Sequence, residues 1–303
     1  MPTETPSGHA PKDPAYGRSI LLVMAAGSFW SLGGILVRLV EAAGPWQILL
    51  VRSVTLSITL FIVLLFRHRS ALLNEVRGIG LDGVAGALCL GVAFTGFMFA
   101  LIHTSVANAV FMLSAAPFLV APLAWLLLGE RVRRATWIAM VFAVAGVAVM
   151  VAGGISAGAL FGNLAAISAV FGFAGFALTL RRKRQTDTLT LVCLAGIFTA
   201  VVAAMLVDNF TYSLYDFGLC TVMGVIQMGV GMAFFTLGSR HVPAAELTLL
   251  SLTEVVLGPI WVWLWIGETP RLWTLLGGAV VMAALIGHGL SGMRRKPPPL
   301  GAV

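Results

Sequence analysis

The chain has 303 residues, of which 59% are hydrophobic and only 10% are charged, with a formal net charge of +7. A soluble domain usually carries about 25% charged residues, so most side chains here must face lipid or each other. The positive charge does not indicate a nucleic-acid partner, because the basic residues form short clusters between long apolar runs, as membrane loops do.

The first segment of the chain, residues 1–18, is predicted to be a disordered cytoplasmic tail. Met1–Pro14 contains several Pro, Thr and Ser residues and no apolar core of its own, so it is not a cleavable signal peptide. At the other end, residues 291–303 form a second, basic tail that we also expect in the cytoplasm.

Ten apolar runs follow, each close to the roughly 20 residues that a membrane-spanning helix needs. They are Ser19–Val40, Trp46–Phe66, Gly80–Ile102, Ser105–Leu128, Ala135–Val151, Leu160–Leu180, Leu189–Val207, Asp216–Leu237, Ala244–Trp265 and Leu272–Leu290. The loops between them are short, so neighbouring helices must be antiparallel. The sequence therefore predicts an all-α polytopic membrane protein with ten transmembrane helices.

The positive residues set the orientation, because cytoplasmic loops are enriched in Lys and Arg. If the N-terminus is cytoplasmic, most of the 19 Lys and Arg residues fall on the inner side. These are Lys12 and Arg18; Arg67, Arg69 and Arg77; Arg131, Arg133 and Arg134; Arg181, Arg182, Lys183 and Arg184; Arg240; and Arg294, Arg295 and Lys296. Both termini are therefore predicted to be cytoplasmic.

The chain also contains a duplication. Gly80–Val149 aligns with Gly218–Gly287 without a gap, and the matched pairs include His103/His241, Trp125/Trp263 and Glu130/Glu268. Five spans fall in residues 19–152 and five in residues 158–290, so the two halves enter the membrane from opposite sides. An inverted repeat of this kind is typical of secondary transporters that alternate access to a site between the halves.

Three motifs carry a family resemblance. They are Gly-Pro-Trp-Gln-Ile-Leu-Leu-Val-Arg at Gly44–Arg52; Ala-Leu-Ile-His-Thr-Ser-Val-Ala-Asn at Ala100–Asn108 with Ser-Ala-Ala-Pro at Ser114–Pro117; and the Gly-Glu endings of Trp125–Glu130 and Trp263–Glu268. In their order and spacing the chain resembles the ten-helix EamA-type branch of the drug/metabolite transporter superfamily, from about Ile20 to Leu290.

The resemblance implies two inverted five-helix halves around a central cavity. Helices three, four, eight and nine would line it, together with helices one and six. It also implies a prokaryotic inner membrane and cargoes such as amino acids, other metabolites or toxic compounds, often exported. The chain departs from the family at Glu254-Val255, where members frequently have Glu-Pro.

Glu254 is the strongest candidate site residue. It lies ten residues into the predicted helix Ala244–Trp265, about 15 Å deep and close to the middle of the bilayer. A carboxylate at that depth costs at least ~2.5 kcal/mol and generally faces a pathway or a partner. It could balance a cationic part of the solute or carry a proton; the alternative is a protonated carboxyl hydrogen-bonded between packed helices.

Four further polar or aromatic residues are candidates for solute contact. Gln227, near the middle of the eighth helix, could bind a polar group of the solute or join helices by hydrogen bonds. Trp30, in the middle of the first helix, could form an aromatic wall or simply pack. Ser251, one turn from Glu254, and Ser114, near the equivalent position of the repeat, could each add a hydroxyl.

Arg52 lies about 9 Å inside the outer end of its helix. We expect its guanidinium to reach the outer surface; alternatively it pairs with a carboxylate of the solute or with Glu41. Glu130 and Glu268 stand at helix ends, where a carboxylate would cap the following helix.

No enzyme or metal motif stands out. There is no His-Glu-x-x-His, nucleophile elbow or phosphate-binding loop, and Cys89, Cys193 and Cys220 have no metal-site spacing. We therefore expect no cofactor, no ATP-driven step and no enzyme. The leading hypothesis is a secondary active transporter, an exporter of a small organic solute such as an amino acid, amine, metabolite or drug, with proton coupling open. The alternatives are a non-transporting scaffold, a lipid scramblase or an intramembrane lipid enzyme.

Overall fold

The computed structural model describes residues 14–68, 75, 77–129, 134–155, 159–182, 187–238, 250 and 252–293. Within these residues all regular structure is helical. Eight of the described helical segments are long and apolar enough to cross a membrane, and two shorter apolar ones are Thr253–Ile266 and Leu272–Gly287. The prediction of an all-helical membrane protein is confirmed at this level.

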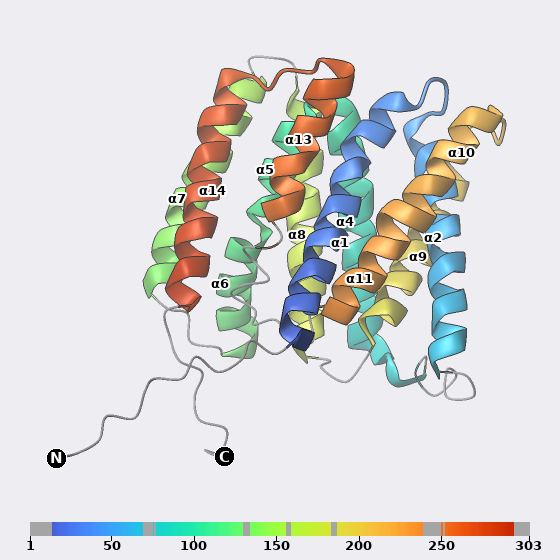
Figure 1. Cartoon of the computed structure of the whole chain (residues 1–303), viewed down its shortest axis with the longest axis horizontal. Helices are drawn as coiled ribbons and strands as arrows, with labels where there is room; N and C mark the ends of the chain where they lie inside the picture. Colours follow the sequence, from blue (N-terminus) through green and yellow to red (C-terminus); the bar gives the residue numbers. More distant parts are fainter. Residues whose placement is uncertain are drawn as a thin grey trace.

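Figure 1 shows the helices side by side, running between an upper and a lower face. In chain order they are α1 (Pro14–Leu39), α2 (Pro45–His68), α4 (Gly80–His103), α5 (Val106–Ser114), α6 (Ala116–Leu128), α7 (Arg134–Ile155), α8 (Leu160–Arg182), α9 (Thr188–Leu206), α10 (Leu214–Val222), the π-helix η2 (Met223–Val230), α11 (Gly231–Gly238), α13 (Leu252–Ile266) and α14 (Leu272–Met293). The start of α1 and the end of α14 lie at the same, lower face (Figure 1).

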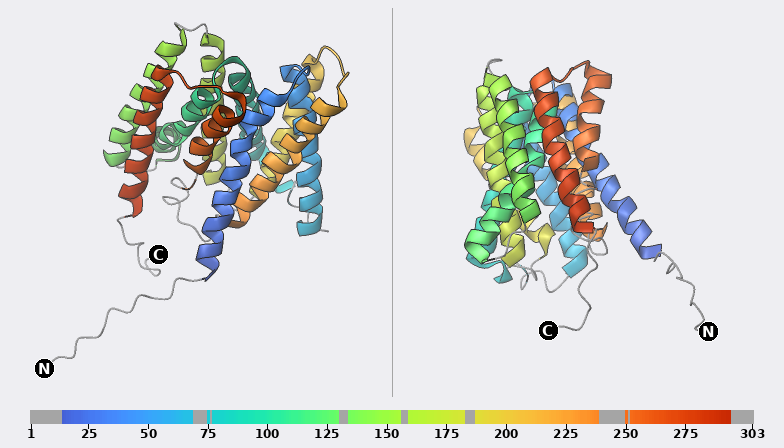
Figure 2. Two further views of the ribbon diagram at one scale, coloured as in Figure 1. Left: turned by 45° about the horizontal axis from the view of Figure 1, so that its top comes forward. Right: turned by 90° about the vertical axis from the view of Figure 1, so that its left-hand side faces the viewer.

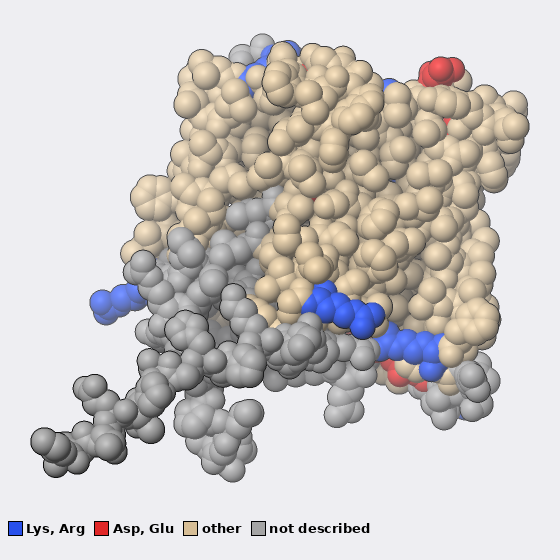
Figure 3. All heavy atoms as spheres, in the orientation of Figure 1, with Lys and Arg blue, Asp and Glu red and all other residues tan. Residues whose placement is uncertain are grey.

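The helices form a central group flanked by two pairs. The pair α7 and α14 packs at one end of the molecule, and α2 packs against α9 at the other, while α1, α4, α8 and α13 lie between them (Figures 1 and 2). Figure 3 shows charged side chains at the upper and lower edges, separated by a broad band without visible Lys, Arg, Asp or Glu. This band is what a bilayer requires of the outer surface.

The predicted helix Ser105–Leu128 is not continuous. It is divided into α5 and α6 by a turn at Ala115, whose N–H bonds to the carbonyl of Met112. The cause is Pro117, the second residue of α6, which has no N–H to donate to the carbonyl one turn back. The break leaves a helix end in the middle of a predicted span.

The predicted helix Asp216–Leu237 also differs from a regular α-helix. Ser213 caps its start by accepting the N–H of Asp216, and the eight residues of η2 in its centre form a π-helix. Gly224 permits the contact of η2 with α2, because a Cβ there would collide with the Thr55 side chain and the carbonyl oxygen of Arg52.

The ninth helix is described only in part. α13 begins at Leu252, and residues 239–249 and 251, which include the first part of the predicted Ala244–Trp265, lie outside the described residues. α13 is followed by Gly267 at φ 73°, and α6 by Gly129 at φ 67°. Both glycines adopt the left-handed conformation that ends a helix most cheaply at Gly.

Several basic residues used for the orientation cannot be placed. Lys12, Arg69, Arg131, Arg133, Lys183, Arg184, Arg240, Arg294, Arg295 and Lys296 all lie outside the described residues. The tail prediction for residues 1–18 needs one adjustment, since α1 already begins at Pro14.

Candidate functional site

Polar side chains in the interior gather around the middle of α1. The amide Nε2 of Gln227 in η2 donates to the carbonyl oxygen of Trp30, 3.2 Å away, and the same amide contacts Gly33 one turn further along α1. Gln227 is only 4% exposed. The structure therefore brings these two predicted site residues together, through the helix-joining hydrogen bond that was one of the alternatives for Gln227.

The indole of Trp30 lies against α11. It packs over Gly231, where a Cβ would collide with the ring nitrogen, and stacks obliquely on Phe235 at 5.3 Å between ring centres. Its N–H is buried and has no hydrogen-bond partner among the described residues. An orphaned indole N–H in an apolar interior is costly, and it marks a place where a polar group could bind.

The neighbouring residue Ser31 connects α1 to α13. Its hydroxyl donates to the carbonyl of Ser28 and accepts the indole N–H of Trp261 at 3.0 Å. Gly27, one turn earlier, lies against Thr253 and the backbone nitrogen of Glu254. The start of α13 therefore packs directly on the middle of α1.

Glu254 occupies the first turn of α13, twelve residues before its last residue Ile266 and so about 18 Å from that end. It lies two turns from Trp261 and hence on the side of α13 that faces α1. The residue is partly exposed, and no hydrogen bond or ion pair of its carboxylate is found among the described residues. Its position next to the α13 N-terminus is favourable for a negative charge.

Arg52 does not reach the surface, and that prediction is wrong. The residue is only 5% exposed, with the guanidinium carbon 5.5 Å from the ring centre of Phe94 in α4. The alternative pairing with Glu41 is also absent, since the Glu41 side chain is exposed and only its N–H is bound, to Asp216. Arg52 lies in the second turn of α2, where its own carbonyl oxygen and the side chain of Thr55 lie against Gly224 of η2.

The two serine candidates contribute less. The hydroxyl of Ser114, at the end of α5, donates to the carbonyl of Phe111 in its own helix. Ser251 lies outside the described residues.

A polar pocket of about 380 Å³ opens at the upper face, where α1, α4 and α13 end and α5, α8 and α14 begin. Arg38 Nε bonds to Glu268 Oε2 at 2.7 Å and Arg38 Nη2 to the carbonyl of Thr104 at 2.8 Å. The second oxygen of Glu268 accepts the N–H of Val106, the first residue of α5, at 2.9 Å. Glu268 thus caps α5 and not the following helix, which corrects the prediction; Glu130 lies outside the described residues.

Two buried asparagines meet at this pocket, and one of them, Asn108, lines it. The amide of Asn108 in α5 donates to the side-chain oxygen of Asn163 in α8, at 2.5 Å. The Asn108 side-chain oxygen is itself buried without a partner among the described residues. Sequence reasoning missed both asparagines, although an Asn near the end of an apolar run is a recognisable signal.

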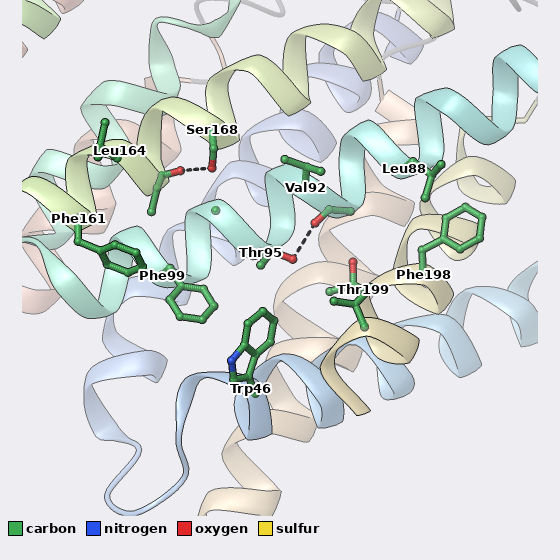
Figure 4. A pocket seen from close by; sticks show the side chains of 14 residues that line it. Trp46, Leu88, Val92, Thr95, Phe99, Phe161, Leu164, Ser168, Phe198 and Thr199 are labelled. Carbon is green, nitrogen blue, oxygen red and sulfur yellow. Dashed lines mark hydrogen bonds between the residues drawn. The ribbon is translucent and has the colours of Figure 1, made fainter. Parts of the chain in front are cut away.

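A second pocket, of about 580 Å³, is almost entirely apolar and lies between α4, α8, α9 and the start of α2. Figure 4 shows the rings of Trp46, Phe99 and Phe161 gathered at one end, while the hydroxyls of Thr95 and Ser168 are turned to backbone carbonyls. Leu88, Val92 and Leu164 on its rim are about half exposed. This pocket suits hydrocarbon, and neither pocket is lined by any of the six predicted site residues.

Metal-ligating side chains are dispersed in the described part of the chain. No group of three or more His, Cys, Asp or Glu side chains there is arranged to hold a metal ion, and the three cysteines are free.

Comparison with known proteins identifies the relatives of this chain. The sequence pattern of the EamA-like transporter family matches it twice, at residues 17–152 and 156–289. The chain belongs to this family. It is 28% identical over 276 residues to the pseudopaline exporter CntI of Pseudomonas aeruginosa strain PAO1, covering 88% of this chain and 94% of the exporter. It is 29% identical over 240 residues to an uncharacterized transporter of Archaeoglobus fulgidus, covering 77% and 86%.

A solved crystal structure shares the fold with a TM-score of 0.62 and 17% identity, over 92% of this chain and 100% of the other. The family membership and the apolar helices together make this EamA-like chain an integral membrane transporter, as the resemblance in sequence implied.

Proposed function

We propose that this EamA-like protein is a secondary active transporter that exports a small organic solute across the bacterial inner membrane by alternating access. The observation that carries the proposal is the set of polar groups without described partners inside the helix bundle. These are the carboxylate of Glu254, the guanidinium of Arg52 and the indole N–H of Trp30. Such groups are rare in membrane spans and usually mark a solute or ion pathway.

The packing supports an arrangement of ten spans in two inverted halves. In the alignment of Gly80–Val149 with Gly218–Gly287, an offset of 138 residues, α4 corresponds to α10–η2–α11. By their order in the two halves, α1 corresponds to α8. The extensive contact of α4 with α8 then has its equivalent in that of α1 with α11 and η2. The contact of α1 with α13 is matched by that of α8 with α6. The two helix-ending glycines, Gly129 and Gly267, lie at the same offset.

Contacts at helix ends repeat in the same way. Arg38, at the end of α1, binds at the end of α13, and Arg182, at the end of α8, donates to the carbonyl of Leu127 at the end of α6. In our proposal the first contact closes the outer face and the second lies at the inner face, with both termini in the cytoplasm. The Arg and Lys clusters in the sequence support this orientation.

We assign the coupling role to Glu254. Because its carboxylate has no described partner and lies about 18 Å from the end of its helix, it can exchange a proton or bind a cationic group of the solute as the cavity opens to either side. Gln227 and Trp30 would form the wall of the same cavity, on the other side of α1.

The test is transport by purified protein in liposomes, with amino acids, amines and lipophilic cations supplied with and without a pH gradient. Glu254→Gln keeps the size and a hydrogen-bonding oxygen but cannot ionise, so flux should fall at least tenfold or lose its dependence on pH. Glu41→Gln, at an exposed position, is the matched control. No flux of any solute with the wild-type protein would refute transport, and a protein indifferent to Glu254→Gln would favour a scaffold or lipid scramblase.

A further inference from the structure

Two charged residues are buried in the described part of the chain, and they differ in whether their charged groups have hydrogen-bond partners there. The carboxylate of Asp216 is fully buried and accepts the N–H groups of Glu41, Ala42 and Ala43, each at 3.0 Å. Arg52 is nearly as deeply buried, yet no hydrogen bond or ion pair of its guanidinium is found among the described residues. Backbone N–H groups therefore account for the burial of the Asp216 carboxylate, whereas no contact among the described residues accounts for the burial of the Arg52 guanidinium.

The chemistry of arginine makes this situation unusual. A guanidinium stays charged in proteins and carries five N–H donors in a planar fork that matches a carboxylate. The ring of Phe94 covers one face of it at 5.5 Å, which stabilises the cation through the ring electrons but leaves the donor edge without a partner among the described residues. A structural arginine would normally hold a carboxylate or carbonyl at that edge.

The location ties Arg52 to the site already described. Its carbonyl oxygen lies against Gly224 at the contact of α2 with η2, one helical turn before Gln227. Phe94 belongs to the same apolar cluster as Met228 of η2, and Trp30 packs against that cluster. Arg52, Gln227 and Trp30 are thus held by one packed unit of α1, α2, α4 and η2.

We propose that Arg52 binds a carboxylate of the transported solute, and that the cargo is accordingly an organic acid or a zwitterion of the amino-acid type. The inference rests on the proposed transport function and specifies its substrate class. The fork of Arg52 would accept the carboxylate in a bidentate contact, while Phe94 holds the guanidinium plane in place.

Matched pairs of solutes test this directly. Proteoliposomes are loaded with tryptophan or tryptamine, histidine or histamine, and leucine or isopentylamine, so that the members of each pair differ by one carboxylate. Wild-type protein is compared with Arg52→Met, Arg52→Lys and the control Arg18→Met, which removes an arginine at an exposed position. Arg52→Met should reduce the acid-to-amine flux ratio roughly 10- to 100-fold, since a hydrogen-bonded charge pair contributes about that much. Arg52→Lys should be intermediate.

Thermal unfolding in detergent separates binding from a structural role. Since the charge has no partner in the part of the chain that the structure describes, Arg52→Met removes an uncompensated buried charge and should leave the midpoint unchanged or raise it. A lowered midpoint with equal loss of all solutes would show that Arg52 is structural and would overturn the inference.

Changing the lipid of the proteoliposomes tests the other source of an oxyanion, a phospholipid headgroup. If Arg52 held a headgroup phosphate, replacing the phospholipid by a phosphate-free neutral glycolipid would change wild-type flux of acids and amines alike, and Arg52→Met would abolish that change. This result would also overturn the inference. An unchanged acid-to-amine ratio in Arg52→Met would refute carboxylate binding while leaving transport intact. Absence of flux for every pair in the wild type would instead refute the transport proposal, and the substrate class with it.

Discussion

The ion pair of Arg38 with Glu268 offers the most direct test of alternating access. It joins the end of α1 to the end of α13 at 2.7 Å, and the same carboxylate caps α5. Opening of the upper face in our proposal requires α1 and α13 to separate there, which breaks this bond. Glu268→Gln is the chosen change, because the amide oxygen can still accept the N–H of Val106 while the charge that attracts Arg38 is lost.

The size of the effect follows from the exposure of the pair. Both side chains are about one quarter exposed, at 23% and 22%, so the pair is neither fully screened nor deeply buried. Replacing a charge-assisted hydrogen bond by a neutral one in this setting should cost the closed state about 1 kcal/mol. If the outward-open state is the minor one, its population should rise about fivefold.

Cysteine labelling measures that population. Met150 is 1% exposed and lines the upper pocket, so Met150→Cys should react with a membrane-impermeant maleimide, applied outside the cell, only when this face opens. The expected result is an approximately fivefold faster reaction with Glu268→Gln. Arg38→Met should give at least the same increase, because it also removes the hydrogen bond to the carbonyl of Thr104. The double variant should show no further increase over Arg38→Met, because the two side chains form one interaction. An unchanged rate, or an equal increase from the inner side in inverted vesicles, would refute the assignment of this pair to the outer closure.

Two further predictions concern the packing that positions the site. Asp216→Ala removes the buried carboxylate that accepts three backbone N–H groups of the loop Glu41–Ala43. Because hydrogen bonds to a charged group stabilise more than neutral ones, the free energy of unfolding should fall by roughly 3 kcal/mol or more. Equilibrium unfolding in detergent measures this loss, and a loss below about 1 kcal/mol would contradict the role given to Asp216. Gly224→Ala would place a Cβ against Thr55 and the carbonyl of Arg52, so α2 and η2 must move apart. The midpoint of thermal unfolding should therefore fall. Gly218→Ala is the control, because its Cβ position has open space around it, and its midpoint should stay unchanged.

The sequence was sufficient for the class of fold and for several interior residues. Apolar runs about 20 residues long predict membrane helices almost regardless of packing, because the bilayer imposes their length. Gln227 and Trp30 stand out in the sequence by their mid-helix positions, and the structure joins them by a hydrogen bond. The motif Ser114–Pro117 contains the proline that explains the break after α5, but an apolar run alone does not show whether a proline bends or divides its helix.

The positions of charged side chains could not be predicted in the same way. Depth along a helix follows from counting residues, but the direction in which Arg52 points depends on rotation about the helix axis, which is set by contacts of α2 with η2 and α4. The partner of Glu268 was missed for a similar reason, since Arg38 and Val106 are far from it in sequence and meet it only in the packed bundle.

The arrangement around α1 connects the site with the proposed movement. Two adjacent residues of α1 bind helices from different parts of the second half: the carbonyl of Trp30 accepts Gln227 of η2, and the hydroxyl of Ser31 accepts Trp261 of α13. Because adjacent residues of a helix point about 100° apart, α1 is held between η2 and α13. If η2 and α13 move apart, α1 cannot keep its hydrogen bonds to both helices. Displacement of α13 relative to η2 must therefore break one of these bonds, at the depth where Trp30 and Glu254 lie. A solute bound there would replace the lost hydrogen bond, and its differential contacts would favour one arrangement over the other, which is the physical requirement for coupling binding to movement.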